Sequence, residues 1–297
     1  MEAGFAVTHD AKLLGSEASS VLEDCLDVLG SNFVSKARLQ LWGLVGLFDP
    51  IVARHTHDKP LPAGVDDSLR LRLEKAAARQ MFSIFSGIGI KAQGCSDAEA
   101  RLETLRLCSG RALHHILVNM EEACSVAQGA PIGARQDEVR FDVYRGHRSS
   151  NNARLLLYSG HDWTLMPLLA VLCPGWGAKT SKMYSEAGKK PGEANASEEG
   201  LWIPYAADVS VELFVDEAVP SSSKERFFVR VMYCGRPLPL QQCKADADGF
   251  CTLAAFTQYV RDNVAIDKLT EWSAACQHTV EGTSKSKSTS GAPPANK

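Results

Sequence analysis

The stretch "LLLYSGHDWTLMPLL", residues 155–169, places two ionisable side chains between two apolar runs. The run "ARLLLYS" at 153–159 is short, apolar and bounded by turn residues, which is typical of a strand buried on both faces. The run "TLMPLLAVL" at 164–172 favours a helix. We therefore expect His161 and Asp162 at the point where a buried strand ends and a helix begins.

This position suits phosphate chemistry. In open α/β sheets, ligands bind beyond the carboxyl ends of strands, and a helix N-terminus offers free N–H groups to an anion. A histidine can donate a hydrogen bond to a phosphoryl oxygen, and an adjacent aspartate with a raised pKa can protonate a departing alkoxide. His161 and Asp162 are thus candidates for hydrolysis of a phosphomonoester. The alternative is that Asp162 only caps the helix and His161 is structural.

The composition is that of a globular chain, with 297 residues of which 45% are hydrophobic. The formal net charge of -3 and the lack of a basic stripe argue against a nucleic-acid partner. No apolar run reaches the roughly eighteen residues of a transmembrane segment, and the first residues do not resemble a signal peptide. The nine cysteines form no C-x-x-C pair, so no structural zinc site is predicted.

The first half of the chain is expected to be helical. After an N-terminal tail at 1–14, a helical subdomain is predicted at 15–140. Apolar residues repeat at helical spacing in four segments: 19–30, 36–48, 66–85 and 97–127. Ser20 and Glu23 have the spacing of a capping box for the first helix, and Gly30 is suited to end it.

The second half, residues 141–276, has an α/β pattern. Two antiparallel strands are predicted at 208–215 and 225–235, followed by a helix at 251–264. The polar segment 178–200 is expected to be a disordered insertion, and 277–297 a disordered tail. Three strands are too few for a sheet covered by helices on both faces, so this layer is expected to be incomplete.

The segment "LLLYSGHDWTL" resembles the strand, His-Asp and helix signature of the histidine acid phosphatases, which form branch 2 of the histidine phosphatase superfamily. Further segments resemble the same family in the same order, over about residues 15–276: "LWGLVGLFDPIVARHTHDKPLP", "RLCSGRALHHILVNMEEA", "WIPYAADVSVELF", "VRVMYCGRPLPLQQC" and "CTLAAFTQYV".

The resemblance implies part of a phosphoglycerate-mutase-like three-layer α/β domain with an inserted helical subdomain. It implies that His161 binds phosphate and that Asp162 donates a proton to the leaving group, with no metal or cofactor. Its implied substrates are small phosphomonoesters, including lysophospholipids or inositol phosphates, in a secretory or endolysosomal compartment. Trp163 departs from the small residue usual after His-Asp. Cys243 and Cys251 match a local cysteine pair of the family, and the resemblance implies that they form a disulfide in an oxidising compartment.

The nucleophile of the family has no counterpart here. The resemblance implies a phosphohistidine formed in an R-H-G-x-R-x-P motif, and the 297 residues contain no such motif. The near matches "ARHTHD" at 53–58 and "YRGHR" at 144–148 have the wrong pattern. We therefore expect the chain to be the C-terminal portion of an acid phosphatase, inactive and poorly folded by itself, because buried strands would lack their partners.

Two other classes of function are open at this point. One is a non-catalytic phosphate-binding, lipid-binding or scaffold protein that retains the fold without the chemistry. The other is a metal hydrolase that uses His55, His57, His114 and His115. This second class is disfavoured, because His55 and His57 are expected in a loop and adjacent histidines on a helix point apart.

Overall fold

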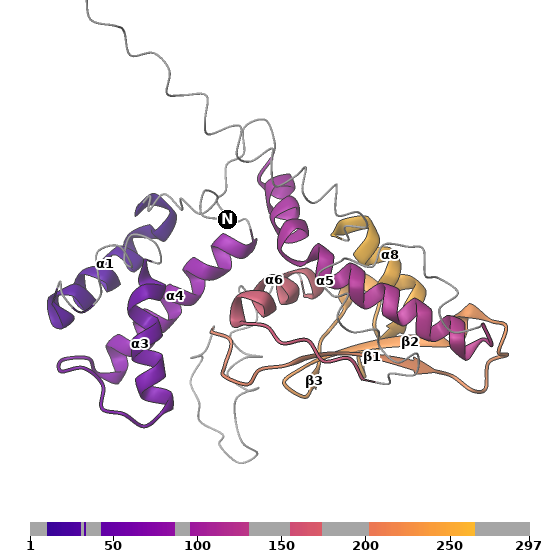
Figure 1. The fold of residues 1–297 in the computed structure, drawn as a ribbon. Coiled ribbons are helices and arrows are strands. Elements are labelled where there is room, and N and C mark those ends of the chain that lie inside the picture. The colour runs from indigo at the N-terminus through magenta and orange to yellow at the C-terminus, as the bar shows by residue number, and fades with distance from the viewer. Residues whose placement is uncertain are drawn as a thin grey trace, which may run out of the picture.

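The computed structural model describes residues 11–30, 33, 43–86, 96–130, 155–173 and 202–264. Within these residues the chain forms six α-helices and one four-stranded antiparallel sheet (Figure 1). The predictions made for 36–42, 178–200 and 277–297 lie outside the described residues.

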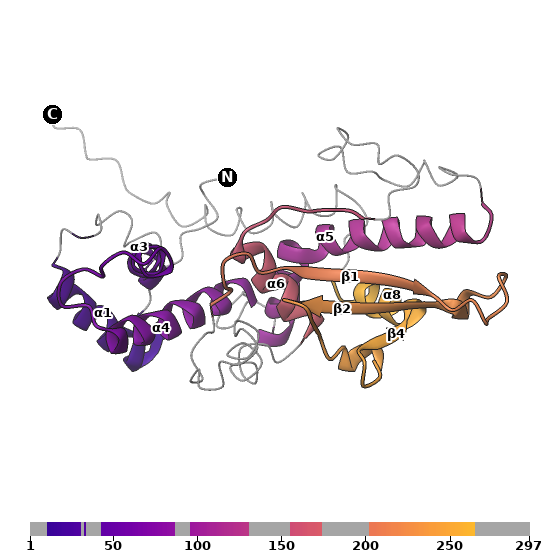
Figure 2. The same cartoon turned by 90° about the horizontal axis from the view of Figure 1, so that it is seen from below.

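Three helices form a group at the N-terminal side of the fold, seen on the left in Figures 1 and 2. They are α1 (Ala11–Leu29), α3 (Leu44–Thr56) and α4 (Asp67–Ser86), and α4 contacts both of the others. The helices predicted near 19–30 and 66–85 are confirmed. Their shared core consists of fully buried apolar side chains, among them Cys25, Leu47, Phe48, Ile51 and Leu73.

The start of α1 was predicted too late. Ser20 lies inside the helix, so the capping box expected of Ser20 and Glu23 is wrong. The helix continues to Ala11 because its apolar pattern extends further back than the local capping signal. The predicted end is confirmed, since Gly30 has a φ of 73° and its N–H donates to the carbonyl oxygen of Leu26 at 2.9 Å.

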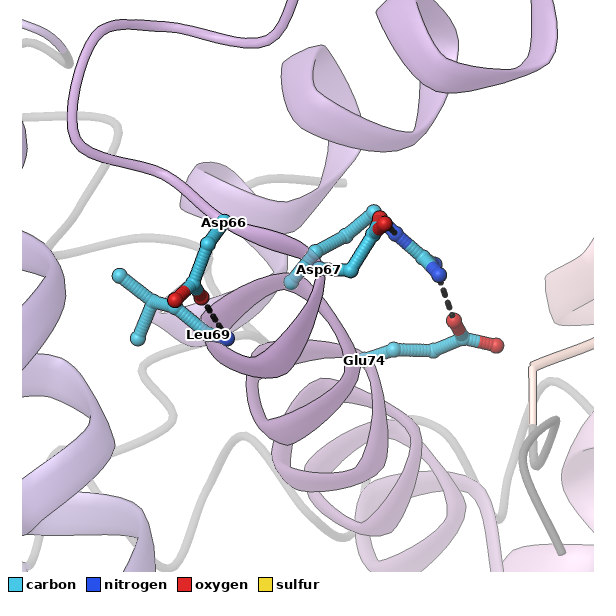
Figure 3. A network of polar contacts seen from close by, with 5 residues as sticks. Asp66, Asp67, Leu69 and Glu74 are labelled. Atoms are coloured by element: carbon cyan, nitrogen blue, oxygen red, sulfur yellow. Dashed lines mark hydrogen bonds and ion pairs between the residues drawn. The ribbon is translucent and has the colours of Figure 1, made fainter. Parts of the chain in front are cut away.

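The acidic residues at the start of α4 fix where that helix begins (Figure 3). The Oδ1 atom of Asp66 accepts a hydrogen bond from the N–H of Leu69 at 2.7 Å, which satisfies a donor that has no partner within the helix. One turn further on, Arg70 bonds to Asp67 at 3.3 Å and to Glu74 at 3.2 Å. Local side chains therefore provide the polar contacts of this helix end.

The start of α3 is capped from another helix. Gly43 precedes α3 with a φ of 55° and has no side chain to act as a cap. Instead, the Oε1 atom of Gln80 on α4 accepts the N–H of Leu44 at 3.0 Å, in a buried setting. A Cβ atom at position 43 would lie 2.5 Å from the amide of Gln80, so this contact requires glycine.

Replacing Gln80 by Met should lower the free energy of unfolding by about 1–3 kcal/mol, because the N–H of Leu44 would remain buried without an acceptor. Chemical denaturation followed by circular dichroism measures this change. The same replacement at Gln242, whose side chain is exposed, is the matched control and should change stability by less than about 0.5 kcal/mol. Equal losses of stability at the two positions would contradict the role of Gln80 as the cap of α3.

The long helix predicted at 97–127 is confirmed as α5 (Asp97–Ala127). A capping box starts it, in which Ser96 accepts the N–H of Glu99 at 3.3 Å and Glu99 accepts the N–H of Ser96 at 2.7 Å. The predicted helix behind the His-Asp pair is α6 (Asp162–Leu172), and it packs against α4 and α5.

The sheet consists of β1 (Val209–Val215), β2 (Phe227–Tyr233), β3 (Arg236–Pro237) and β4 (Phe250–Thr252). The predicted antiparallel pairing of the strands at 208–215 and 225–235 is confirmed as β1 with β2. The short strands β3 and β4 also pair with β2, and the 3₁₀ turns η2 (Lys224–Arg226) and η3 (Gln241–Cys243) lie in the connections.

The two faces of the sheet differ. On one face, β2 buries Phe227, Val229, Val231 and Tyr233 at alternate positions. The helix α8 (Leu253–Asn263), which confirms the helix predicted at 251–264, packs against β2 and β4. On the other face, Arg230 pairs with Glu212 at 2.8 Å and lies over the rings of Phe214 and Phe250, 5.2 and 4.8 Å from their centroids.

Cys243 on η3 and Cys251 on β4 are both buried, and their thiols share a hydrogen bond. This bond lowers the pKa of Cys243 and raises the pKa of Cys251, whose burial adds to the rise. Both are free thiols in this structure, so the disulfide implied by the resemblance stays a prediction.

The buried strand predicted at 153–159 is wrong for its described part. Residues 155–160 are irregular and exposed, with Leu155 and Leu157 showing 72% and 85% of their surface. A strand buried on both faces needs hydrogen-bonded neighbours, and none of the strands in the described part of the chain pairs with this segment. Tyr158 of this segment is anchored to α5, since its hydroxyl accepts a hydrogen bond from Asn119 at 3.4 Å.

Exposed apolar side chains of this kind favour self-association. Replacing Leu157 by Ser should increase the soluble monomeric fraction and leave the helix content unchanged, as measured by size-exclusion chromatography with light scattering and by circular dichroism. The same change at the fully buried Leu169 should instead destabilise the fold by about 3 kcal/mol or more. An unchanged association state in the Leu157 variant would contradict a role of residues 155–160 in self-association.

Candidate functional site

His161 is the N-cap residue of α6, and its side chain is exposed. Its backbone N–H donates to the Oγ1 atom of Thr164 at 3.3 Å, which holds the chain at the entrance to the helix. Gly160 precedes it, where a Cβ atom would lie 3.1 Å from the side chain of Thr164. The small residue at 160 and the hydroxyl at 164 therefore set the direction in which the chain enters α6.

Asp162 is the first residue of α6 rather than its N-cap, and its side chain is half-buried. Its Oδ1 atom accepts the N–H of Trp163 at 2.9 Å. Its carboxyl also accepts a hydrogen bond from the side chain of Trp202, whose indole N–H is a donor only. The carboxyl is thus held from two sides, by the start of the helix and by a segment that precedes β1.

The pKa of Asp162 is raised. Burial is the largest cause, and the negative charge of Asp49 acts in the same direction. The hydrogen bonds from Trp163 and Trp202 and the nearby His161 oppose the rise without cancelling it. A carboxyl in this state keeps its proton to a higher pH than usual, which is the property of a general acid.

Three residues near Asp162 were not predicted from the sequence. Asp49 comes from α3, and Trp202 and Tyr205 come from the segment before β1. Tyr205 is exposed, yet partial burial and the charges of Asp49 and Asp162 raise its pKa. No motif or spacing signals these contacts, because the residues lie far apart in the sequence and meet only in the folded chain.

Trp163, the unusual residue after the pair, is half-buried and faces the helical group. Its ring lies 6.1 Å from the ring of Phe85 on α4, with the two planes tilted by 40°. This contact helps to hold the start of α6 against α4. The structure therefore gives Trp163 a packing role.

The four histidines proposed as metal ligands do not form a cluster. Within the described part of the chain, no group of three or more His, Cys, Asp or Glu side chains is arranged to hold a metal ion. His55 lies in α3, so the loop expected there is wrong, and His57 is the C-cap residue of that helix. His115 packs against the ring of Tyr158 at 5.6 Å, and burial followed by the charge of His114 lowers the pKa of His115.

Part of the chain that carries this site matches a known protein family. Residues 103–234 match the family model of the histidine phosphatase superfamily (branch 2), a span that includes most of α5, the His-Asp pair, β1 and β2. Over this span the match confirms the resemblance stated from the sequence. Among curated proteins, none matches the chain significantly.

Of the described helices, none has the length and apolar character needed to cross a membrane.

The raised pKa of Asp162 has a consequence for stability. In the unfolded chain an aspartate ionises near its ordinary pKa, so above that pH the folded state must hold a carboxylate that its surroundings disfavour. Asp162→Asn should therefore raise the melting temperature at pH 7, and the gain should vanish as the pH falls below the ordinary pKa of an aspartate, about 3.9. Calorimetry between pH 3 and 7 measures this. A variant less stable than the parent at pH 7 would contradict the argument.

Proposed function

We propose that this chain supplies the acid side of a phosphomonoesterase site, in which His161 binds the phosphoryl group and Asp162 protonates the leaving group. The observation that carries the proposal is the half-buried carboxyl of Asp162, with its raised pKa, directly beside the exposed His161 at the start of α6. The match of residues 103–234 to the histidine phosphatase superfamily supports phosphatase-type hydrolysis of small phosphorylated substrates.

The proposed reaction has two steps. In the first, a histidine nitrogen attacks phosphorus, a P–N bond forms, and the P–O bond to the leaving group breaks as Asp162 gives its proton to the departing oxygen. In the second, water attacks phosphorus, the P–N bond breaks, and the carboxylate of Asp162 takes the proton of the water. His161 donates a hydrogen bond to a phosphoryl oxygen throughout, and the positive end of the α6 dipole favours the same negative charge.

The nucleophilic histidine is the part of the reaction not assigned to these residues. The R-H-G-x-R-x-P motif does not occur in the 297 residues, so we propose that the attacking imidazole comes from a segment outside them. Under this proposal α5, α6, α8 and the sheet are part of a three-layer phosphoglycerate-mutase-like domain, and the α1, α3 and α4 group is its helical subdomain. Acid phosphatase activity on small esters, lysophospholipids or inositol phosphates would then belong to the complete site.

Binding of inorganic phosphate to the purified chain tests the proposal without requiring turnover. Phosphorus-31 NMR titration with inorganic phosphate at pH 5 should show saturable binding. This binding should weaken about tenfold or more in His161→Ala, since a charge-assisted hydrogen bond contributes about 1.5–3 kcal/mol. Asp162→Asn should bind phosphate at least as well as the parent, because it removes a carboxylate that repels the anion. His55→Ala, which changes an exposed histidine on α3, is the matched control and should bind normally.

Equal binding by the parent and His161→Ala would contradict the proposal. A second measurement separates catalysis from binding: release of p-nitrophenol from p-nitrophenyl phosphate at acid pH, in the parent chain and in Asp162→Ala. Release that depends on Asp162 would support an enzyme complete enough to turn over. Binding that depends on His161, without any release, would support a chain that holds only the acid side of the site.

One observation favours a second candidate, a phosphate-binding or scaffold protein without catalysis. The sequence retains the His-Asp pair but lacks the family's nucleophile motif. Addition of a separately expressed segment carrying the R-H-G-x-R-x-P strand of a family member distinguishes the two candidates. Hydrolysis that appears on mixing and is lost in Asp162→Ala would favour the enzyme, and phosphate binding that never leads to hydrolysis would favour the binding protein.

A further inference from the structure

The carboxyl of Asp162 is linked to α3 through an aromatic side chain. Trp202 donates its indole N–H to this carboxyl. The ring of Trp202 lies 4.9 Å from the ring of Phe48, at an angle of 60°, and Phe48 is fully buried on α3. The indole is therefore held against the helical group at its ring and directed at the acid by its N–H.

The residue after Phe48 carries a negative charge that acts on Asp162. Asp49 is exposed on α3, and its charge raises the pKa of both Asp162 and Tyr205. Among the described residues, the charges that act on Asp162 come from Asp49 on α3 and His161 on α6, although α4 and α5 also pack against α6. One turn of α3 thus carries both the ring that contacts Trp202 and a carboxylate whose charge acts on Asp162.

We propose that Trp202 and Asp49 are positioning residues for Asp162: the indole N–H, held by the ring contact with Phe48, fixes the orientation of its carboxyl, and Asp49 at the next position of α3 supplies the negative charge that acts on it. This inference rests on the proposed role of Asp162 as the acid. It assigns the helical group a part in the chemistry, since both contacts depend on the position of α3.

Trp202 and Asp49 shift the ionisation of Asp162 in opposite directions, and this makes the proposal specific. A hydrogen bond from an indole N–H favours the ionised carboxylate, whereas a neighbouring carboxylate disfavours it. Trp202 therefore steadies the group in the state it reaches after proton transfer, and Asp49 favours the state before transfer. A residue that only packed against α6 would not separate these effects.

The test follows the ionisation of Asp162 directly, so it requires neither substrate nor nucleophile. The chain is labelled with carbon-13 at aspartate carboxyl groups, the Asp162 signal is assigned by its loss in Asp162→Asn, and its shift is followed from pH 2 to 8. Asp49→Asn should move the midpoint of this titration to lower pH, because a like charge is removed. Trp202→Phe, which keeps a ring beside Phe48 but removes the donor, should move it to higher pH.

Asp27→Asn removes an exposed carboxylate from α1 and is the matched charge control, for which the midpoint should not move. Midpoints unchanged in both site variants, or displaced in the same direction, would overturn the proposal. Should Trp202→Phe fail to fold, the indole N–H signal of Trp202 in the parent chain replaces it. That signal should follow the ionisation of Asp162 and lose its pH dependence in Asp162→Asn, and a signal that ignores Asp162 would overturn the role of Trp202.

The outcome is independent of phosphate binding. Opposite displacements with no phosphate binding would leave the coupling established and remove the proposed function. Phosphate binding that depends on His161, with unchanged midpoints, would leave the proposed function and remove the coupling.

Discussion

Burial of α6 is the constraint on which the site depends. Every residue from Met166 to Leu172 is buried, so this helix is apolar on all sides and must be enclosed by other elements. Contacts with α4 and α5 enclose it, and the hydroxyl of Tyr259 on α8 donates to the carbonyl oxygen of Val171 at 2.6 Å. Since the body of the helix has no polar side chain to offer solvent, His161 and Asp162 can lie only at its start.

This arrangement places opposing demands on Asp162. A carboxylate in the first turn of a helix is favoured by the helix dipole and by free N–H groups. Burial and the charge of Asp49 act against the ionised form and prevail, since the pKa is raised. A carboxyl that only served the stability of α6 would be better placed in full contact with water. The observed position instead costs the folded chain stability once Asp162 ionises, a pattern common at functional sites.

Patterns with strong local periodicity were predicted well from the sequence. The helix α5 follows from a long apolar repeat, and the pairing of β1 with β2 follows from alternation on either side of a turn segment. The segment 155–160 was wrong because burial of a strand depends on partners that a local pattern does not contain. Asp49 and Trp202 were missed for a related reason: each has an ordinary local role, and only the fold brings them to Asp162.

The candidate site therefore combines residues from parts of the chain that lie far apart in the sequence. The His-Asp pair supplies the groups that would meet a phosphoryl ligand, and it is fixed by its place in the sequence. Burial and the N–H of Trp163 act on the pKa of Asp162 locally, and further contributions come from α3, more than a hundred positions earlier, and from the segment before β1. Phe48 links Trp202 to the core of the helical group. A shift of α3 would therefore change both the indole N–H that Asp162 accepts and the negative charge of Asp49 that acts on Asp162. Under the proposal made above, the helical group therefore influences the chemistry of a motif that it does not contain.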